Sequence, residues 1–336
     1  MFTARSLTFL LGPLFSKKSW LALDLGVCLA AGIRWPGADT PSPILWERAS
    51  QPQAGAGEGL PTFHIDEAHG RSETSRRLVG IMDYRRASRD LPFHISCFPS
   101  HVLTDPKHIA AISQEALSYN ADLVVIDQPY GLDLGYGASL HLLLPLASSL
   151  QALTHSTNAA VLILLQTRTR PQRAAIAKAL SALGVDHVLG LDFYPTDMPK
   201  ATPYNKFLPR YRSGYLHLRT LASVGGGQFP VYARIHASDH AFSLAAIDRI
   251  PNLQTLKLST FQTTFGPAGL ALLRFLLAKG SANTRELMFG VAASVPTRIR
   301  TLVHQLSREG YIHCIKHGGA GHPAVYALTS SGKSLI

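Results

Sequence analysis

Short continuous runs of aliphatic residues, each ending in a polar side chain, constrain the fold of this chain more than any other feature. Residues 121–126 contain Leu-Val-Val-Ile and lead to Asp127, and residues 159–165 lead to Gln166. Strands buried on both faces of a parallel sheet show such runs, whereas half-buried strands alternate apolar and polar residues. We therefore predict an α/β fold over the first two-thirds of the chain, with polar groups at the strands' carboxyl ends.

The rest of the pattern predicts two domains. Further strands are expected at 7–11, 43–46 and 187–191, helices at 19–31 and 170–183, and a later strand pair at 215–221 and 231–235. From residue 266 the pattern changes to short helices followed by a glycine-rich hairpin. We predict a first domain over 1–258, with its core at 6–195 and a basic, proline-rich loop and the strand pair in 196–258, and a second domain over 266–336.

Chain length excludes some classes of protein, and net charge indicates the kind of partner. The 336 residues suffice for about two domains with a buried core, which excludes a disordered tail protein and a disulfide-stapled mini-protein. Lys and Arg number 32 against 21 acidic residues, a net charge of +11, although only 16% of residues are charged. This excess favours phosphates or another acidic partner.

Cysteine usage and hydropathy predict a cytoplasmic protein that is not in a membrane. Cys28, Cys97 and Cys314 are far apart and form no CxxC pair, so neither a disulfide framework nor a zinc cluster is indicated. The apolar residues near the start are interrupted by Lys17, Lys18 and Asp24. Neither resulting run approaches the roughly 18 residues of a membrane span, and no signal or anchor is expected.

Residues 12–19 follow a predicted strand and precede a predicted helix, and they resemble a phosphate-binding loop. In the pattern G-x-x-x-x-G-K-[ST], backbone N–H groups hold phosphates, the lysine reaches their outer oxygens and the hydroxyl binds magnesium. Gly12, Lys18 and Ser19 match, but Lys17 replaces the second glycine. A glycine-type conformation costs another residue about 1–3 kcal/mol. The alternative is an ordinary strand-turn-helix with two surface lysines.

The surrounding sequence resembles the RecA/DnaB-like ATPases, especially small hexameric plasmid replication helicases. The similarity includes KSWLALDL at 18–25 with AAG at 30–32, LVVID at 123–127, the strand ending in Gln166, and DHVL at 186–189. It spans roughly residues 6–240, in the family's order. The resemblance implies a RecA-like P-loop NTPase fold, ATP and Mg²⁺ as ligands, and an oligomer in the form of a ring or dimer.

The resemblance also implies roles for individual residues. Nucleotide would bind at Gly12, Lys17, Lys18, Ser19 and Asp127, with Ser19 and Asp127 holding the magnesium ion. Catalytic roles fall to Lys18, to Glu47 as activator of the attacking water, to Gln166 as sensor of the γ-phosphate, and to Arg219 as a finger reaching a neighbouring subunit's nucleotide. The family's K-x-R pattern is incomplete around Arg219, where the sequence is His217-Leu218-Arg219.

Several of these residues have alternatives. Glu58, Asp66 and Glu67 lie near Glu47 in the sequence and compete for its role. Gln166 fits an ordinary strand-end amide, and Asp127 fits the cap of a turn. Asp127-Gln128-Pro129-Tyr130 is distantly similar to the D-P-P-Y motif of adenine methyltransferases, but the glycine motif that such enzymes need for S-adenosylmethionine is missing from the sequence.

Residues 266–336 resemble the winged helix-turn-helix of MarR-like and PadR-like regulators, notably through Tyr326-Ala327-Leu328-Thr329-Ser330-Ser331-Gly332. Eight basic residues oppose two acids here, a net charge of +6 and more than half of the total. A recognition helix would present residues to a DNA major groove and the wing would contact phosphates. The expected DNA-binding residues are Thr297, Arg298, Arg300, Thr301, His304, Lys316 and His317. A protein-interaction module is the alternative, and His313, His317 and His322 make a poor metal cage.

These features predict an ATP-binding motor or switch protein that acts on DNA in the replication or maintenance of a plasmid, phage or mobile element. ATP hydrolysis, and DNA unwinding with it, depends on whether the loop works with Lys17 in place of glycine. The alternative is a non-hydrolysing DNA-binding regulator whose degenerate phosphate loop belongs to a dimerisation scaffold.

Overall fold

The computed structural model of the chain forms two compact units. Unit 1 comprises residues 1–168 and 173–250, and unit 2 comprises residues 169–172 and 251–336. The structure describes residues 4–13, 16–33, 35, 59–67, 69–97, 99–129, 142–167, 169–196, 212–224, 231–238, 241–291, 296–319 and 322–336. Each unit is described by itself below.

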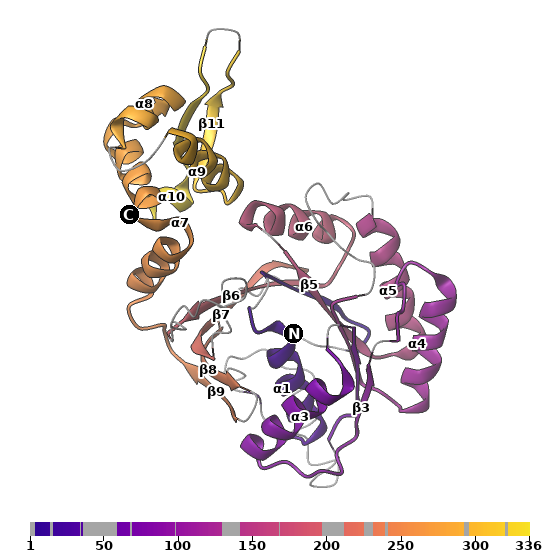
Figure 1. Cartoon of the computed structure of the whole chain (residues 1–336). Coiled ribbons are helices and arrows are strands. Elements are labelled where there is room, and N and C mark those ends of the chain that lie inside the picture. Colours follow the sequence, from indigo (N-terminus) through magenta and orange to yellow (C-terminus); the bar gives the residue numbers. More distant parts are fainter. Residues whose placement is uncertain are drawn as a thin grey trace. The chain divides into compact units, whose positions relative to one another are not determined.

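Unit 1 is built on a nine-stranded, mostly parallel sheet (Figure 1). The strand order is β3-β2-β4-β5-β1-β6-β7-β8-β9, with parallel pairing from β3 to β6 and antiparallel pairing from β6 to β9. The strands are β1 Leu7–Gly12, β2 Thr62–Asp66, β3 Phe93–Cys97, β4 Leu123–Asp127, β5 Ala160–Gln166, β6 His187–Pro195, β7 Ser213–Ser223, β8 Val231–Ser238 and β9 Ala241–Ile247.

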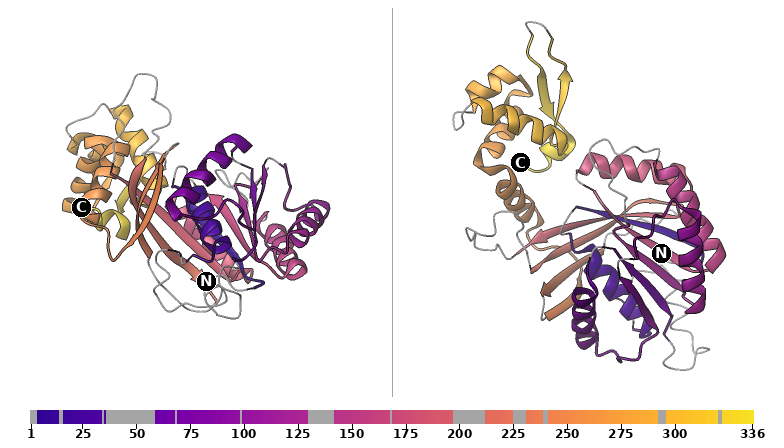
Figure 2. Two further views of the ribbon diagram at one scale, coloured as in Figure 1. Left: turned by 90° about the horizontal axis from the view of Figure 1, so that it is seen from below. Right: turned by 45° about the vertical axis from the view of Figure 1, so that its right-hand side comes forward.

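Helices cover both faces of the parallel part (Figure 2), which is why its central strands β4 and β5 are continuously aliphatic up to their last residue. On β1, Leu10 packs in the cluster formed with α1 and α3, whereas Phe9 and Leu11 pack in the cluster formed with α4, α5 and α6. The helices are α1 Lys18–Ala30, α3 Arg71–Arg85, α4 Pro106–Ser118, α5 Leu143–Thr157 and α6 Arg170–Ala182. The carboxyl ends of the parallel strands therefore meet at one edge of a rigid, three-layered core.

A buried ion pair fixes α3 to α1. Arg85 donates from Nε to Asp24 Oδ1 (2.7 Å) and from Nη2 to Asp24 Oδ2 (2.6 Å). Trp35 Nε1 donates to Asp24 Oδ2 at 2.8 Å. Burial raises the pKa of Asp24, although these hydrogen bonds and the Arg85 charge oppose that shift. The carboxylate is fully buried, so its three donors replace the water that it would lose on folding.

Unit 2 has short helices and a small antiparallel sheet in the order β10-β12-β11. Its first helix bends at Gly266, which has a positive φ of 69° and is followed by Pro267. The elements are α7 Leu253–Lys279, β10 Ser281–Asn283, α8 Thr284–Gly290, α9 Pro296–Arg308, β11 Ile312–Lys316, β12 Val325–Leu328 and α10 Ser330–Lys333. Asn283 and Glu286 form a capping box at the start of α8.

Hydrogen bonds of the Leu-Thr-Ser-Ser-Gly segment at 328–332 connect the end of β12 to the residues after α9. The Thr329 hydroxyl donates to Gly310 O (2.6 Å) and accepts a hydrogen bond from Gly332 N (3.1 Å). A β-carbon at position 332 would lie 2.1 Å from Tyr311 O, so only glycine fits there. The threonine and glycine of the sequence pattern therefore have a local structural role in joining β12 to the end of α9.

The predicted α/β class, with a large mostly parallel sheet, is confirmed, but some elements differ from the prediction. The predicted strand at 43–46 lies outside the described residues, and the described strands β2 and β3 were not foreseen. Three antiparallel strands follow β6 instead of a pair, and unit 1 ends at residue 250 instead of 258 because α7 starts at Leu253.

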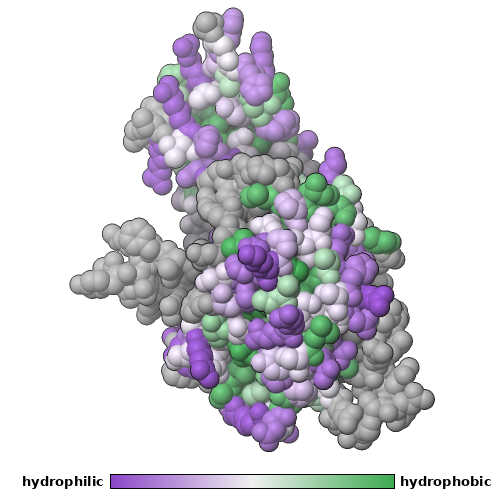
Figure 3. All heavy atoms as spheres, turned by 90° about the vertical axis from the view of Figure 1, so that its right-hand side faces the viewer, coloured by the Kyte–Doolittle hydropathy of each residue, from purple (hydrophilic) through white to green (hydrophobic). Residues whose placement is uncertain are grey.

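Among the described residues, no helix is long and apolar enough to cross a membrane. Hydrophilic and hydrophobic residues are intermixed over the described part of the face seen in Figure 3.

Candidate functional site

Gly12 ends the central strand β1 at a crowded point. It pairs with Gln166 at the end of β5, and its carbonyl accepts from Thr167 N at 2.9 Å. A β-carbon at position 12 would lie 2.7 Å from Ser16 Oγ and 3.0 Å from Leu191 O. Glycine is therefore required where the chain leaves the sheet and turns towards α1.

Lys17 adopts the backbone conformation expected of the glycine that it replaces. Its φ of 67° and ψ of 19° are left-handed, a region that costs a residue with a β-carbon about 1–3 kcal/mol. Its Nζ lies 5.8 Å from the centroid of the Phe193 ring on β6. The loop thus keeps a glycine-type backbone turn immediately before α1, with the long side chain packed along an aromatic ring.

Replacing Lys17 with glycine should stabilise the protein. Relief of about 1–3 kcal/mol of left-handed strain exceeds the roughly 0.5–1 kcal/mol entropic cost of glycine, so the free energy of unfolding should rise by about 1 kcal/mol. Lys17→Ala is the matched control, because it removes the amine and keeps the strained backbone. Denaturant unfolding measures both, and an equal gain in Lys17→Ala would contradict the strain argument.

Lys18 opens α1 and is buried beneath the loop. Its Nζ donates to Gly12 O (3.0 Å), Pro13 O (2.9 Å) and Ser16 Oγ (3.2 Å). Burial lowers its pKa to about 8, with the Asp127 charge opposing and the Arg173 charge reinforcing the shift. The amine is therefore a mostly protonated cation at neutral pH, held by carbonyl and hydroxyl oxygens of its own loop.

If the loop holds a phosphate ligand, as the sequence predicts, this pKa determines how the affinity for that ligand depends on pH. Only the protonated amine attracts an anion, so affinity should be constant below pH 8 and fall by up to tenfold per pH unit above it. Titrating ATP binding between pH 7 and 9.5 measures the break, and Lys18→Met should lack it. A wild-type affinity that is flat to pH 9.5 would contradict the assignment of Lys18.

Asp127 lies at the end of β4 with its carboxylate enclosed. The residue is 1% exposed, and neither carboxylate oxygen has a hydrogen-bond partner of ordinary geometry among the described residues. Burial raises its pKa to about 6; the nearby Ser19 hydroxyl and the Lys18 charge lower it, and the Asp66 charge raises it further. The structure thus brings Ser19, Lys18 and Asp127 together. The Asp127 carboxylate, which has no hydrogen bond of ordinary geometry, is suited to bind a cation.

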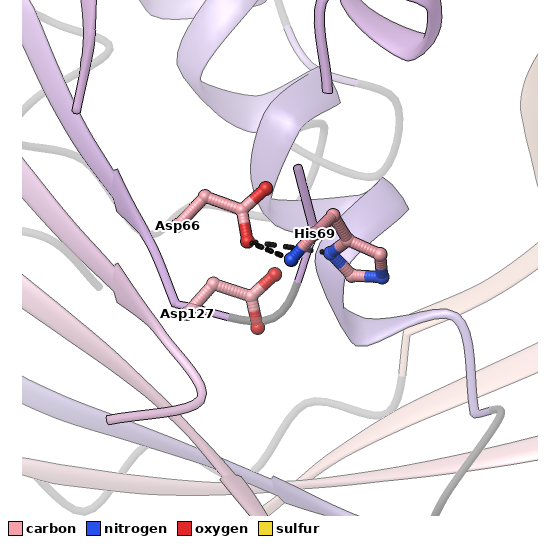
Figure 4. Close-up of side chains that lie close together, drawn as sticks. All are labelled: Asp66, His69 and Asp127. Carbon is pink, nitrogen blue, oxygen red and sulfur yellow. Dashed lines mark hydrogen bonds and ion pairs between the residues drawn. The ribbon is translucent and has the colours of Figure 1, made fainter. Parts of the chain in front are cut away.

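Asp66 and His69 complete this edge of the sheet (Figure 4). Asp66 is the register partner of Asp127 on the neighbouring strand, and its Oδ1 accepts from His69 N (2.8 Å) and lies 3.3 Å from His69 Nδ1. Its Oδ2 accepts from the Thr74 hydroxyl. Burial acts to raise the pKa of Asp66, but the His69 and Thr74 hydrogen bonds outweigh it and hold the pKa at about 2.

The catalytic glutamate that the sequence predicts at position 47 stays a prediction. Glu47 and the strand predicted before it lie outside the described residues. In the described sheet β4 lies between β2 and β5, and Glu67 directly follows β2. The Glu67 carboxylate accepts from Ser100 N (3.2 Å) and His101 N (2.9 Å). The sequence left Asp66 and Glu67 as alternatives, and the aliphatic-aromatic run ending in two acids was the signal for this strand.

The other predicted catalytic residues lie on the same sheet. Gln166 is half-buried beside Gly12. Arg219 on β7 is 41% exposed at its side chain, and its Nη2 lies 3.5 Å from Asp192 Oδ2. Arg173 Nη2 donates to Asp192 Oδ1 (2.9 Å), so Asp192 links the two arginines. Sequence reasoning missed the buried Arg173, because an arginine within a helical pattern gives no sign of facing inwards.

The candidate DNA-binding residues lie on α9 and the β11–β12 hairpin of unit 2. Arg298, Arg300, Thr301 and His304 are exposed on α9, and Lys316 and His317 are exposed on the hairpin; the Thr297 side chain is outside the described residues. The opposite face of α9 is core, with Ile299, Leu302, Val303 and Leu306 buried. The helix therefore has one basic, solvent-facing side.

Comparison with known proteins assigns no family to this chain. No family model matches the chain, and no curated protein is significantly similar to it.

Proposed function

We propose that the protein is a RecA-like, DNA-acting ATPase whose second unit is a winged-helix DNA-binding domain. The observation that carries the proposal is that Asp127, far away in the sequence, meets the loop residues Gly12, Lys18 and Ser19 at one edge of a parallel sheet. Phosphoryl transfer requires little more than a loop of backbone donors, a fixed cation and a ligand for magnesium.

ATP and magnesium fit the residues present. The start of α1 has no acidic residue in its first turn and no side-chain cap at Lys17, so its N–H groups suit phosphate oxygens. Ser19 and Asp127 would hold magnesium, which supplies charge to neutralise the phosphates. Lys18 would exchange its loop carbonyls for phosphate oxygens, and Gln166 lies beside the loop as a sensor.

We assign the water-activating role to Glu67 instead of Glu47. The role belongs to the glutamate that follows the strand next to the magnesium-binding aspartate, and Glu67 has that position in the described sheet. Arg219 would act in an assembly, as a ring or dimer, once released from Asp192.

The proposal is tested by ATP binding and hydrolysis of the full chain with and without DNA. Turnover that rises with DNA is expected. No nucleotide bound at millimolar ATP would overturn the proposal. Replication or maintenance of a plasmid, phage or mobile element is the proposed setting, because the resemblance is to plasmid replication helicases.

DNA binding by unit 2 gives a separate prediction. Arg298→Ala and Arg300→Ala should each lower affinity across DNA sequences and reduce the slope of log affinity against log salt by about 1, if each arginine contacts one phosphate. Lys333→Ala on α10 is the control, since it removes one exposed charge away from α9. Fluorescence anisotropy over a salt series measures the slopes, and equal losses in all three variants would indicate bulk charge alone.

A non-hydrolysing DNA-binding regulator is the second candidate. The observations that favour it are the strained Lys17 in place of glycine and the three hydrogen bonds that hold Lys18 within its own loop. Such a protein would bind specific DNA with the same affinity in the presence and absence of ATP. Its DNA binding would also be unchanged in Lys18→Met, which separates the two candidates.

A further inference from the structure

We propose that Asp66, His69 and Asp127 form a resident site for a first-row transition-metal dication such as Mn²⁺, bound without nucleotide. This site differs from the magnesium position proposed at Ser19 and Asp127, because a ring nitrogen and a second carboxylate join the ligand set. The inference goes beyond ATP hydrolysis and does not depend on it.

The fold brings the three ligand atoms together. Asp66 and Asp127 are register partners at the carboxyl ends of the parallel strands β2 and β4, so both carboxylates emerge at one edge. His69 comes three residues after Asp66, and its backbone N–H is bonded to Asp66 Oδ1 (2.8 Å). One ligand atom from each residue lies within 4.8 Å of the other two. Metal–ligand bonds of about 2.0–2.2 Å require only modest rotation of these side chains.

A second, independent observation indicates a cation between these residues. Both oxygens of Asp127 are buried with no hydrogen-bond partner among the described residues, and the carboxylate lies beside that of Asp66 (Figure 4). A buried carboxylate without a hydrogen bond of ordinary geometry is costly, and a second carboxylate at its side adds repulsion that the nearby Lys18 charge only partly offsets. A dication placed between them would compensate both charges, and at Asp66 Oδ1 it would replace the His69 Nδ1–H donor of the metal-free state.

The imidazole of His69 determines which class of metal ion the site prefers. Mg²⁺ and Ca²⁺ prefer oxygen ligands alone, whereas an imidazole nitrogen shifts preference towards transition metals. Two carboxylates with one imidazole suit Mn²⁺, Fe²⁺, Co²⁺ or Zn²⁺. The Nδ1 atom faces the carboxylates, so it is the ligand atom.

Arg77 should weaken metal binding at His69, so replacing Arg77 should raise the affinity for the metal. Its Nη1 lies 3.1 Å from His69 Nε2, and arginine can only donate, so the ring proton of the metal-free state is on Nδ1. Metal binding at Nδ1 moves that proton to Nε2, where it faces the Arg77 donor. The ring keeps one proton throughout, and the Arg77 guanidinium must turn away.

The test uses the full-length, nucleotide-free chain with Mn²⁺ as probe in excess Mg²⁺, followed by electron paramagnetic resonance. We expect one Mn²⁺ per chain, with magnetic coupling to a ligand nitrogen. His69→Ala should abolish that coupling and weaken Mn²⁺ binding at least tenfold, whereas Arg77→Gln should strengthen it several-fold, since glutamine can accept from Nε2–H. His155→Ala, an exposed histidine on α5, is the matched control and should bind as the wild type does.

The outcomes separate this site from the ATPase proposal. Lys18→Met should bind Mn²⁺ at least as tightly as the wild type, because a neighbouring cation is removed while the three ligands stay. Circular dichroism confirms that each variant is folded. Absence of Mn²⁺ binding, binding unchanged in His69→Ala, or bound Mn²⁺ without nitrogen coupling would overturn the inference, whatever the result with ATP.

Discussion

Lys18→Met is expected to lower ATP turnover by on the order of 10²-fold or more, the size of effect seen when a preorganised electrostatic contact to the transition state is lost. Lys18 Nζ lies beneath the loop that would hold the phosphates, bonded to Gly12 O at 3.0 Å. Methionine has a similar length and packs in the same space, so the change removes charge and donors with little loss of volume. Steady-state phosphate release in the presence of DNA measures the effect.

Lys17→Met is the matched control for this experiment. It removes a neighbouring amine that packs near Phe193 and does not reach into the buried loop interior as Lys18 does. We expect its turnover to stay within a few-fold of the wild type. Lys18→Met turnover within threefold of the wild type would contradict the assignment of Lys18, and equal losses in both variants would indicate a damaged loop.

Arg85→Met is expected to lower the free energy of unfolding by about 3–5 kcal/mol, because removing one partner leaves a buried charge uncompensated. Asp24 is fully buried and receives two hydrogen bonds from Arg85, at 2.7 and 2.6 Å. After the substitution only Trp35 Nε1 would remain as its donor among the partners found in the described residues. Urea unfolding followed by circular dichroism measures the change.

The exposed pair of Arg89 and Asp83 is the control for this prediction. Its side chains are 52% and 63% exposed, so Arg89→Met should change stability by less than about 1 kcal/mol. The double variant Asp24→Leu/Arg85→Met should recover part of the loss, because no unpaired charge stays buried. A double variant that is less stable than Arg85→Met would show that the pair contributes more than charge compensation.

Local patterns were sufficient for the class of fold. The aliphatic runs before Asp127 and Gln166 are strands β4 and β5, because short continuous aliphatic runs are typical of strands covered on both faces. The buried face of α9 also followed from its periodicity, because residues three and four apart share one side of a helix.

Only part of the candidate site could be predicted from local sequence patterns. Gly12, Lys18 and Ser19 are close in sequence, and their motif has a local physical meaning. The strand before Asp66 was missed, because its short run alternates Phe63, His64 and Ile65 and looks unlike the continuous aliphatic runs. His64 is nevertheless fully buried, and nothing in the sequence indicates that this histidine faces inwards.

The sequence by itself determined an α/β chain with a phosphate-loop motif at its start and a basic module at its end, because propensity, periodicity and charge are local properties. Only the tertiary structure decided which strands are neighbours. Strand order depends on how helices pack across the whole sheet, and it places Asp66 beside Asp127 with their carboxylates at a single edge. It also showed that Lys17 takes a left-handed backbone conformation immediately before α1, which a lysine in the sequence does not reveal.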